Sequence, residues 1–114
     1  MFISVKEFLQ EVEQSIKRYF PSAKVELNEF NVLRLKVRVM ITSSLFIDIF
    51  YGYRKRRVDF ALIKDKDRIF GIDNLDNWHY HPIEYPERHE KTPEMSIEQI
   101  MKKFERIINE LKEK

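Results

Sequence analysis

The chain of 114 residues contains no cysteine, only two glycines and no long apolar run. The absence of cysteine excludes a disulfide framework, thiol catalysis and cysteine-ligated zinc. With Gly52 and Gly71 as the only glycines, a phosphate-cradling loop or a dinucleotide-binding fingerprint is excluded as well. A membrane span needs about 20 consecutive apolar residues, and the first residues lack the basic start and apolar core of a signal peptide. We therefore expect a cytoplasmic protein with no membrane partner.

An excess of one charge is also missing, because 21 basic residues face 19 acidic ones. The whole molecule is therefore not a polyanion binder by charge alone. Charged residues make up 35% of the chain, against about 25% in ordinary domains, a composition resembling that of thermophile proteins. Residues 34–57 are locally basic, with Asp48 as their only acid. Their last four residues, Arg54-Lys55-Arg56-Arg57, would contact phosphates well in a hairpin tip, although an ordinary charged turn explains them equally.

Two capping boxes predict the helices. Ser4-Val5-Lys6-Glu7 opens an apolar stripe of helical period that ends before Pro21, with Ile3 and Phe8 as a flanking hydrophobic pair. This pattern predicts a helix over residues 4–20. Ser96-Ile97-Glu98-Gln99 opens a second stripe and predicts a helix over residues 96–112.

Alternating apolar and polar residues over 23–73 predict strands with one buried face. The connections are too short for parallel crossovers, so the strands should form an antiparallel meander. We expect a single α+β domain over 1–114 with two layers: a five-stranded antiparallel meander sheet, and both helices packed on one face. The side chains expected to face the helices are Leu33, Leu35, Val37, Val39, Ile47, Ile49, Phe60 and Leu62.

The segment over residues 73–95, predicted to be irregular, holds all three histidines and the only tryptophan. His79 and His81 should lie on one side of an extended chain, about 6–7 Å apart. With His89 and Asp73 or Asp76 they could ligate a divalent metal, or act as general acid and base near neutral pH. The spacing matches no closed zinc motif, and water-facing loop histidines are common. As loop side chains, they are expected to contribute little to stability.

Other residues of this segment have two interpretations each. Asp73 and Asn74 follow a strand directly, where such side chains usually form turns. Trp78, Tyr80 and Tyr85 could stack on bases, or hold the segment against the core of the domain. Arg88, or Arg68 from the preceding strand, could meet a phosphate.

The order of these residues resembles the TumE family of small prokaryotic toxins from two-gene toxin–antitoxin modules. The resemblance covers about residues 45–108. The chain carries Gly71 where members commonly carry an arginine, and a single histidine after the second proline. The positions that carry the resemblance are Asp73, Asn74, His79, His81, Pro82, Pro86 and His89.

The resemblance implies a cytoplasmic, growth-inhibiting toxin that a cognate antitoxin of the helix-turn-helix type neutralises. RNA as the target is our inference from the residues, since histidines transfer protons, aromatic rings stack on bases and arginines bind phosphate. The leading hypothesis is a metal-independent ribonuclease without cofactors, with His79, His81, His89 and Asp73 as catalytic residues. Substrate-binding candidates are Asn74, Trp78, Tyr80, Arg54, Arg56, Arg57 and Arg88.

Two alternatives remain open: a non-catalytic nucleic-acid- or protein-binding module, and a metal-binding regulator that uses the histidines. On the face of the sheet away from the helices, Phe46 and Phe50 flank Asp48. Two phenyl rings are too apolar to be left in water, so we expect a second copy of the chain or the antitoxin to cover them.

Overall fold

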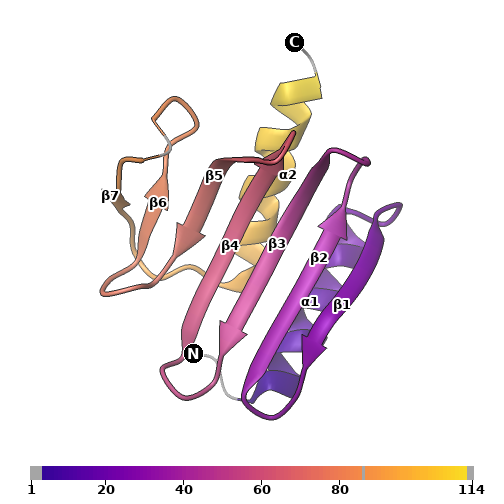
Figure 1. The fold of residues 1–114 in the computed structure, drawn as a ribbon, viewed down its shortest axis with the longest axis vertical. Coiled ribbons are helices and arrows are strands. Elements are labelled where there is room, and N and C mark those ends of the chain that lie inside the picture. The colour runs from indigo at the N-terminus through magenta and orange to yellow at the C-terminus, as the bar shows by residue number, and fades with distance from the viewer. Residues whose placement is uncertain (1–3, 86, 113–114) are drawn as a thin grey trace.

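The computed structural model describes residues 4–85 and 87–112, which form two layers (Figure 1). One layer is a single antiparallel sheet whose seven strands follow one another in sequence order. Both helices lie on the same face of that sheet (Figure 1). The elements are α1 (Val5–Tyr19), β1 (Lys24–Phe30), β2 (Arg34–Met40), β3 (Leu45–Gly52), β4 (Arg57–Lys64), β5 (Asp67–Asp73), β6 (His79–His81), β7 (Glu90–Lys91) and α2 (Ile97–Lys112).

The predicted α+β architecture is confirmed, but the predicted number of five strands is wrong. The two further strands, β6 and β7, come from the segment that was expected to be irregular. They are three and two residues long, too short to produce a periodic apolar pattern. Among the described residues, neither helix is long and apolar enough to cross a membrane.

Both helices begin at the predicted capping boxes. The Glu7 amide donates to the Ser4 hydroxyl (3.0 Å), which in turn donates to the Glu7 carboxylate (3.0 Å). At α2 the exchange is reciprocal: the Gln99 amide donates to Ser96 Oγ (3.1 Å), and the Ser96 amide donates to Gln99 Oε1 (2.9 Å). The predicted contact of Ile3 with Phe8 lies outside the described residues.

The core lies between the helices and the inner face of the sheet. Seven of the eight side chains predicted to face inward are at most 2% exposed. Aromatic rings connect the layers, since Phe104 of α2 lies 6.3 Å from Phe60 and 5.3 Å from Phe70, centroid to centroid. The exception is Leu33, which is 38% exposed. It precedes β2, in a turn where the Asn31 side chain accepts from the Leu33 and Arg34 amides.

The opposite face of the sheet, here called the open face, carries the polar residues. One cross-strand row runs through Lys36, Phe50, Asp59, Asp73 and His79. The neighbouring row runs through Arg38, Asp48, Ala61, Gly71 and His81. The meander thereby places residues from four hairpins side by side, and the two rows end at the histidines of β6.

Candidate active site on the open face

The site is built around the buried carboxylate of Asp73, at the end of β5. Asp73 pairs with His79 across the ladder, so their side chains share the open face. His79 Nε2 lies 3.2 Å from Asp73 Oδ1, and His81 Nε2 lies 3.2 Å from Asp73 Oδ2. The three side chains are only 12%, 8% and 5% exposed for His79, His81 and Asp73. The expectation that these two histidines are exposed loop residues is therefore wrong, because they belong to a strand.

His89 completes the cluster from the other side. After β6 the chain turns back through bonds from the Tyr85 amide to the Pro82 carbonyl (3.2 Å) and from the Arg88 amide to the Tyr85 carbonyl (2.9 Å). The His89 ring then lies 4.6 Å from the His79 ring and 4.4 Å from the His81 ring. One nitrogen of each ring lies within 4.8 Å of the other two. His89 is exposed, so solvent reaches the cluster.

Arg68 lies next to Asp73 because Gly71 has no side chain. A Cβ atom on Gly71 would lie 2.8 Å from Arg68 Nε and 2.9 Å from Arg68 Cζ, so a side chain at residue 71 would have to displace the guanidinium. The guanidinium thus crosses the Gly71 backbone, and its Nη2 lies 3.6 Å from Asp73 and 3.8 Å from Asp59.

Asp59 is a member of the site that the sequence analysis missed. It pairs with Asp73 across the β4–β5 ladder. Burial and the nearby Asp73 charge raise the pKa of the Asp59 carboxyl, while Arg68, Arg57 and His81 oppose that shift. The missed signal was an acidic residue between inward-facing apolar neighbours on a predicted strand.

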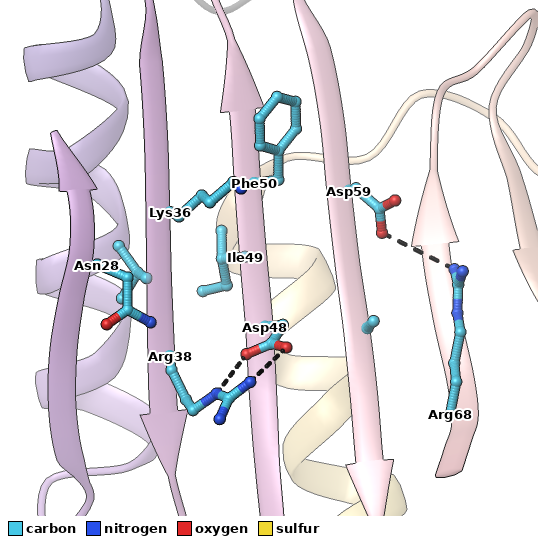
Figure 2. Close-up of a pocket in the computed structure, with 10 residues that line it drawn as sticks. Asn28, Lys36, Arg38, Asp48, Ile49, Phe50, Asp59 and Arg68 are labelled. Carbon is cyan, nitrogen blue, oxygen red and sulfur yellow. Dashed lines mark hydrogen bonds and ion pairs between the residues drawn. The ribbon is translucent and has the colours of Figure 1, made fainter. Parts of the chain in front are cut away.

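A groove of about 390 Å³ lies on the open face, where Asp59 and Arg68 form part of its lining. Figure 2 shows it from the open face, between the Arg38–Asp48 pair and the Asp59–Arg68 pair. Phe50 and Lys36 line one end, and Ala61 lies between the two pairs in its floor.

Asn74 holds the end of the site in place. The Val58 amide donates to Asn74 Oδ1 (2.8 Å), and Asn74 Nδ2 donates to the Arg56 carbonyl (2.9 Å). The Leu75 amide donates to Asp73 Oδ1 (3.0 Å), which fixes the carboxylate. The Asp73 bond is the turn chemistry considered from the sequence, whereas the Asn74 bonds reach a different hairpin and tie its basic tip to the end of β5.

Two of the three aromatic candidates, Trp78 and Tyr80, lie on the helix side of the sheet. Trp78 and Tyr80 alternate with the histidines and pack against the core. The Tyr80 ring lies 6.3 Å from the Phe70 ring, and Lys103 Nζ lies 5.3 Å from the Tyr80 centroid. The structure thus places both rings away from the open-face cluster, which supports the interpretation that they hold the segment on the core.

The arginine candidates divide into two groups. Arg54 and Arg56 lie in the exposed tip between β3 and β4, and Arg57 begins β4, where it pairs with Asp59 at 3.6 Å. Arg88 instead places its guanidinium 5.1 Å from the Tyr85 centroid. Among the described residues, Arg68 is therefore the arginine that contacts Asp73. Pro86, one of the positions of the TumE resemblance, lies outside the described residues.

The resulting arrangement is a line of alternating charges, Arg57, Asp59, Arg68 and Asp73, ending at three imidazoles. Within the described residues, Nε and Nη2 of Arg68 are buried and have no hydrogen-bond partner. Comparisons of this chain with protein-family models, curated proteins and solved structures gave no match.

Proposed function

We propose that the protein is the toxin of a toxin–antitoxin module and cleaves RNA at the cluster around Asp73. One observation carries the proposal: two imidazoles contact one buried carboxylate, a third imidazole lies against both of them, and an adjacent arginine has donors without a hydrogen-bond partner. Clustered titratable groups with an adjacent cation are typical of sites for proton and phosphoryl chemistry.

RNA supplies its own nucleophile, which makes this chemistry possible without a thiol or serine. A base removes the proton of the 2′-hydroxyl, the 2′-oxygen attacks phosphorus, and the bond to the 5′-oxygen breaks as that oxygen is protonated. The products are a 2′,3′-cyclic phosphate and a free 5′-hydroxyl. The Arg68 side chain is 36% exposed and would stabilise the charge that develops on the phosphate. A neutral imidazole of the cluster would act as the base.

The basic tip is the proposed entry for the RNA strand. Asn74 ties the backbone of Arg56 to the end of β5, so a strand whose phosphates contact Arg54, Arg56 and Arg57 would lead to Asp73. Tyr85 is half exposed (49%) on the turn before His89 and is the ring best placed to stack on an unpaired base.

The proposed antitoxin, a helix-turn-helix protein, would neutralise the toxin by covering part of the open face in the cytoplasm. Phe46 and Phe50 lie on that face and are half-buried. Arginine side chains shield them in part, with the Arg38 guanidinium 3.9 Å from the Phe46 centroid and that of Arg34 5.4 Å from the Phe50 centroid. The apolar surface that remains is the proposed contact for the antitoxin, or for a second copy of this chain in a homodimer.

Expression from a tight promoter, with and without the adjacent gene, tests the biological part of this proposal. We expect growth arrest and fragmentation of total RNA, both relieved by the neighbouring gene. The chemical part is tested with purified protein on an end-labelled RNA and on DNA of the same sequence. RNA should yield cyclic phosphate ends, and DNA, which lacks the 2′-hydroxyl, should stay intact. Equal cleavage of both, or of neither, would contradict the mechanism.

A further inference from the structure

We infer that His79, His81, His89 and Asp73 together bind one divalent transition-metal ion. The three ring nitrogens lie within 4.8 Å of one another. Both oxygens of Asp73 lie 3.2 Å from an imidazole Nε2. In a tetrahedral site with bonds of about 2.0–2.1 Å, neighbouring donor atoms are about 3.4 Å apart. The contacts of Asp73 already have this spacing.

The hydrogen bonds of His79 give the strongest argument. Its Nδ1 lies 2.9 Å from the Asn77 carbonyl oxygen. A carbonyl can only accept, so Nδ1 carries a hydrogen, and in the neutral ring Nε2 then has only a lone pair. That lone pair lies 3.2 Å from Asp73 Oδ1, where two acceptors would repel each other. The contact requires either a second proton on the ring or a cation between the two atoms.

A proton on His79 would account for that contact alone. One metal ion accounts for it and also uses the other two rings, whose centroids lie 4.4–5.1 Å from each other and from His79. Metal-binding histidines usually donate their second N–H to a backbone carbonyl or a carboxylate. The bond from His79 to Asn77 is such a contact, and it orients Nε2 toward the ion.

The donor set indicates the class of metal. Imidazole nitrogen suits Zn²⁺, Co²⁺, Fe²⁺ and Ni²⁺, whereas Mg²⁺ and Ca²⁺ prefer oxygen ligands. The His79 and His81 side chains are largely fixed by burial, so the exposed His89 ring is the ligand that would move inward to close the set. From the sequence, metal binding by these histidines was an alternative and not the leading hypothesis, because their spacing along the chain matches no zinc motif.

The role of the ion in RNA cleavage rests on the proposed function, but binding of the ion does not. The ion would supply a base for the 2′-hydroxyl proton, because a metal lowers the pKa of the water that it binds. Arg68 would stay beside Asp73 and bind the phosphate.

The test uses full-length protein without a polyhistidine tag, stripped with a chelator and dialysed. Zn²⁺ is titrated by calorimetry, and Co²⁺ is followed by its visible absorption, which reports ligand number and symmetry. We expect one ion per chain. His89→Ala should weaken binding about 10–100-fold, and because His89 is exposed this variant should fold normally. Asp73→Asn should weaken it as well. Glu84→Gln, an exposed change on the same segment, serves as the control and should bind like the unaltered protein.

Absence of a one-to-one complex would overturn the inference, as would equal affinity of His89→Ala and the control. RNA cleavage then separates the two proposals. Full cleavage by metal-stripped protein in chelator would end the role of the metal in cleavage and leave the ribonuclease intact. Specific metal binding without RNA cleavage under any condition would end the ribonuclease and leave the metal site.

Discussion

Two arginine–aspartate pairs lie on the open face of the same sheet, and they differ in how completely they are satisfied. Arg38 and Asp48 form two parallel hydrogen bonds, of 2.8 and 3.1 Å, with side chains 36% and 41% exposed. Arg68 approaches Asp73 only to 3.6 Å, and Asp73 is 5% exposed. The first pair is complete in itself. In the second pair, the buried donors of Arg68 do not come within hydrogen-bonding distance of the buried Asp73 carboxylate.

This difference distinguishes structural charge from charge available to a ligand. An exposed, bidentate pair contributes little more than local order, typically 0–1 kcal/mol. Buried polar atoms without partners cost free energy, and such costs are tolerated mainly where a ligand completes the site. Because Asp48 and His81 belong to one cross-strand row, the two situations occur in the same local fold and can be compared by mutation.

The largest effect is expected from the histidines, which only the second pair has. Replacing His79, His81 or His89 with Ala should lower RNA cleavage about 10²-fold or more, the usual scale for loss of a group that moves a proton or holds its carrier. Stability should separate the three. His81→Ala removes a buried partner of Asp73 and should cost about 1–3 kcal/mol, whereas His89→Ala should leave the melting temperature nearly unchanged.

Cleavage of labelled RNA and thermal unfolding, measured on the same three proteins, check this expectation. Wild-type cleavage by all three variants would remove the cluster from the mechanism and leave both pairs with a structural role only.

Neutralising one acid of each pair tests the comparison directly. Asp73→Asn removes the charge that two histidines and Arg68 share, and should lower cleavage by about 10²-fold. Asp48→Asn on the same face should change cleavage less than twofold, because its carboxylate is bonded to Arg38 and lies three strands away from His81 in their shared row. Steady-state rates of the two variants give the ratio, and similar losses in both would show that the pairs do not differ in function.

The position of Arg68 can be changed without touching a charged residue. Gly71→Ala places a methyl group against the guanidinium and should push it away from Asp73, lowering cleavage about tenfold while the fold persists. Gly52→Ala is the matched control, since its Cβ would meet only the Phe50 ring at 3.3 Å. Rates and melting curves distinguish the two, and a fully active Gly71→Ala protein would exclude a role for the Arg68 position.

A smaller effect is expected from the satisfied pair itself. A double-mutant cycle of Arg38→Gln and Asp48→Asn, measured by chemical denaturation, should give a coupling energy of about 0–1 kcal/mol. A coupling above 2 kcal/mol would place this pair among the major stabilising contacts, and a purely local role for Arg38 and Asp48 would then be wrong.

The smallest effect concerns Asp59 and depends on pH. Burial raises the pKa of its carboxyl above the ordinary value of an aspartate, so the charged form opposes folding. This penalty is absent below the unfolded pKa, grows as the pH rises from the unfolded pKa to the folded one, and is complete above the folded pKa. Asp59→Asn should therefore raise the melting temperature by a few degrees at pH 7 and by nothing at pH 3. An equal shift at both pH values would assign the effect to packing instead.

The regular part of the fold was predictable because its signals are local. Capping boxes at Ser4 and Ser96 place the helix starts, and strict alternation in β2 to β4 gives both register and the buried face. β6 and β7 have no such signal, since their pairing depends on β5 and on the turn before His89. Leu33 was misassigned because alternation does not reveal where a strand ends.

The site was predictable in its residue types but not in its composition. The spacing of His79 and His81 already indicates a shared side. The same alternation places Trp78 and Tyr80 on the opposite face, a consequence the sequence analysis did not apply to its own candidates. Asp59 joins the site because it pairs with Asp73 across two strands, and Arg68 joins it because Gly71 leaves space for the guanidinium. Neither relation can be seen in the order of residues along the chain.

The short strands β6 and β7 also determine how the site opens. They lie at the edge of the sheet, beyond β5, and hold few backbone hydrogen bonds, so they can separate from it while the rest of the molecule stays folded. Amide protons of residues 79–81 and 90–91 should then exchange with deuterium much faster than those of β3 and β4. A ligand that joins His79, His81 and His89 would slow this exchange, because it links the edge to Asp73 of β5. Slower exchange of the β6 and β7 amides would therefore show that a ligand occupies the site, without any measurement of activity.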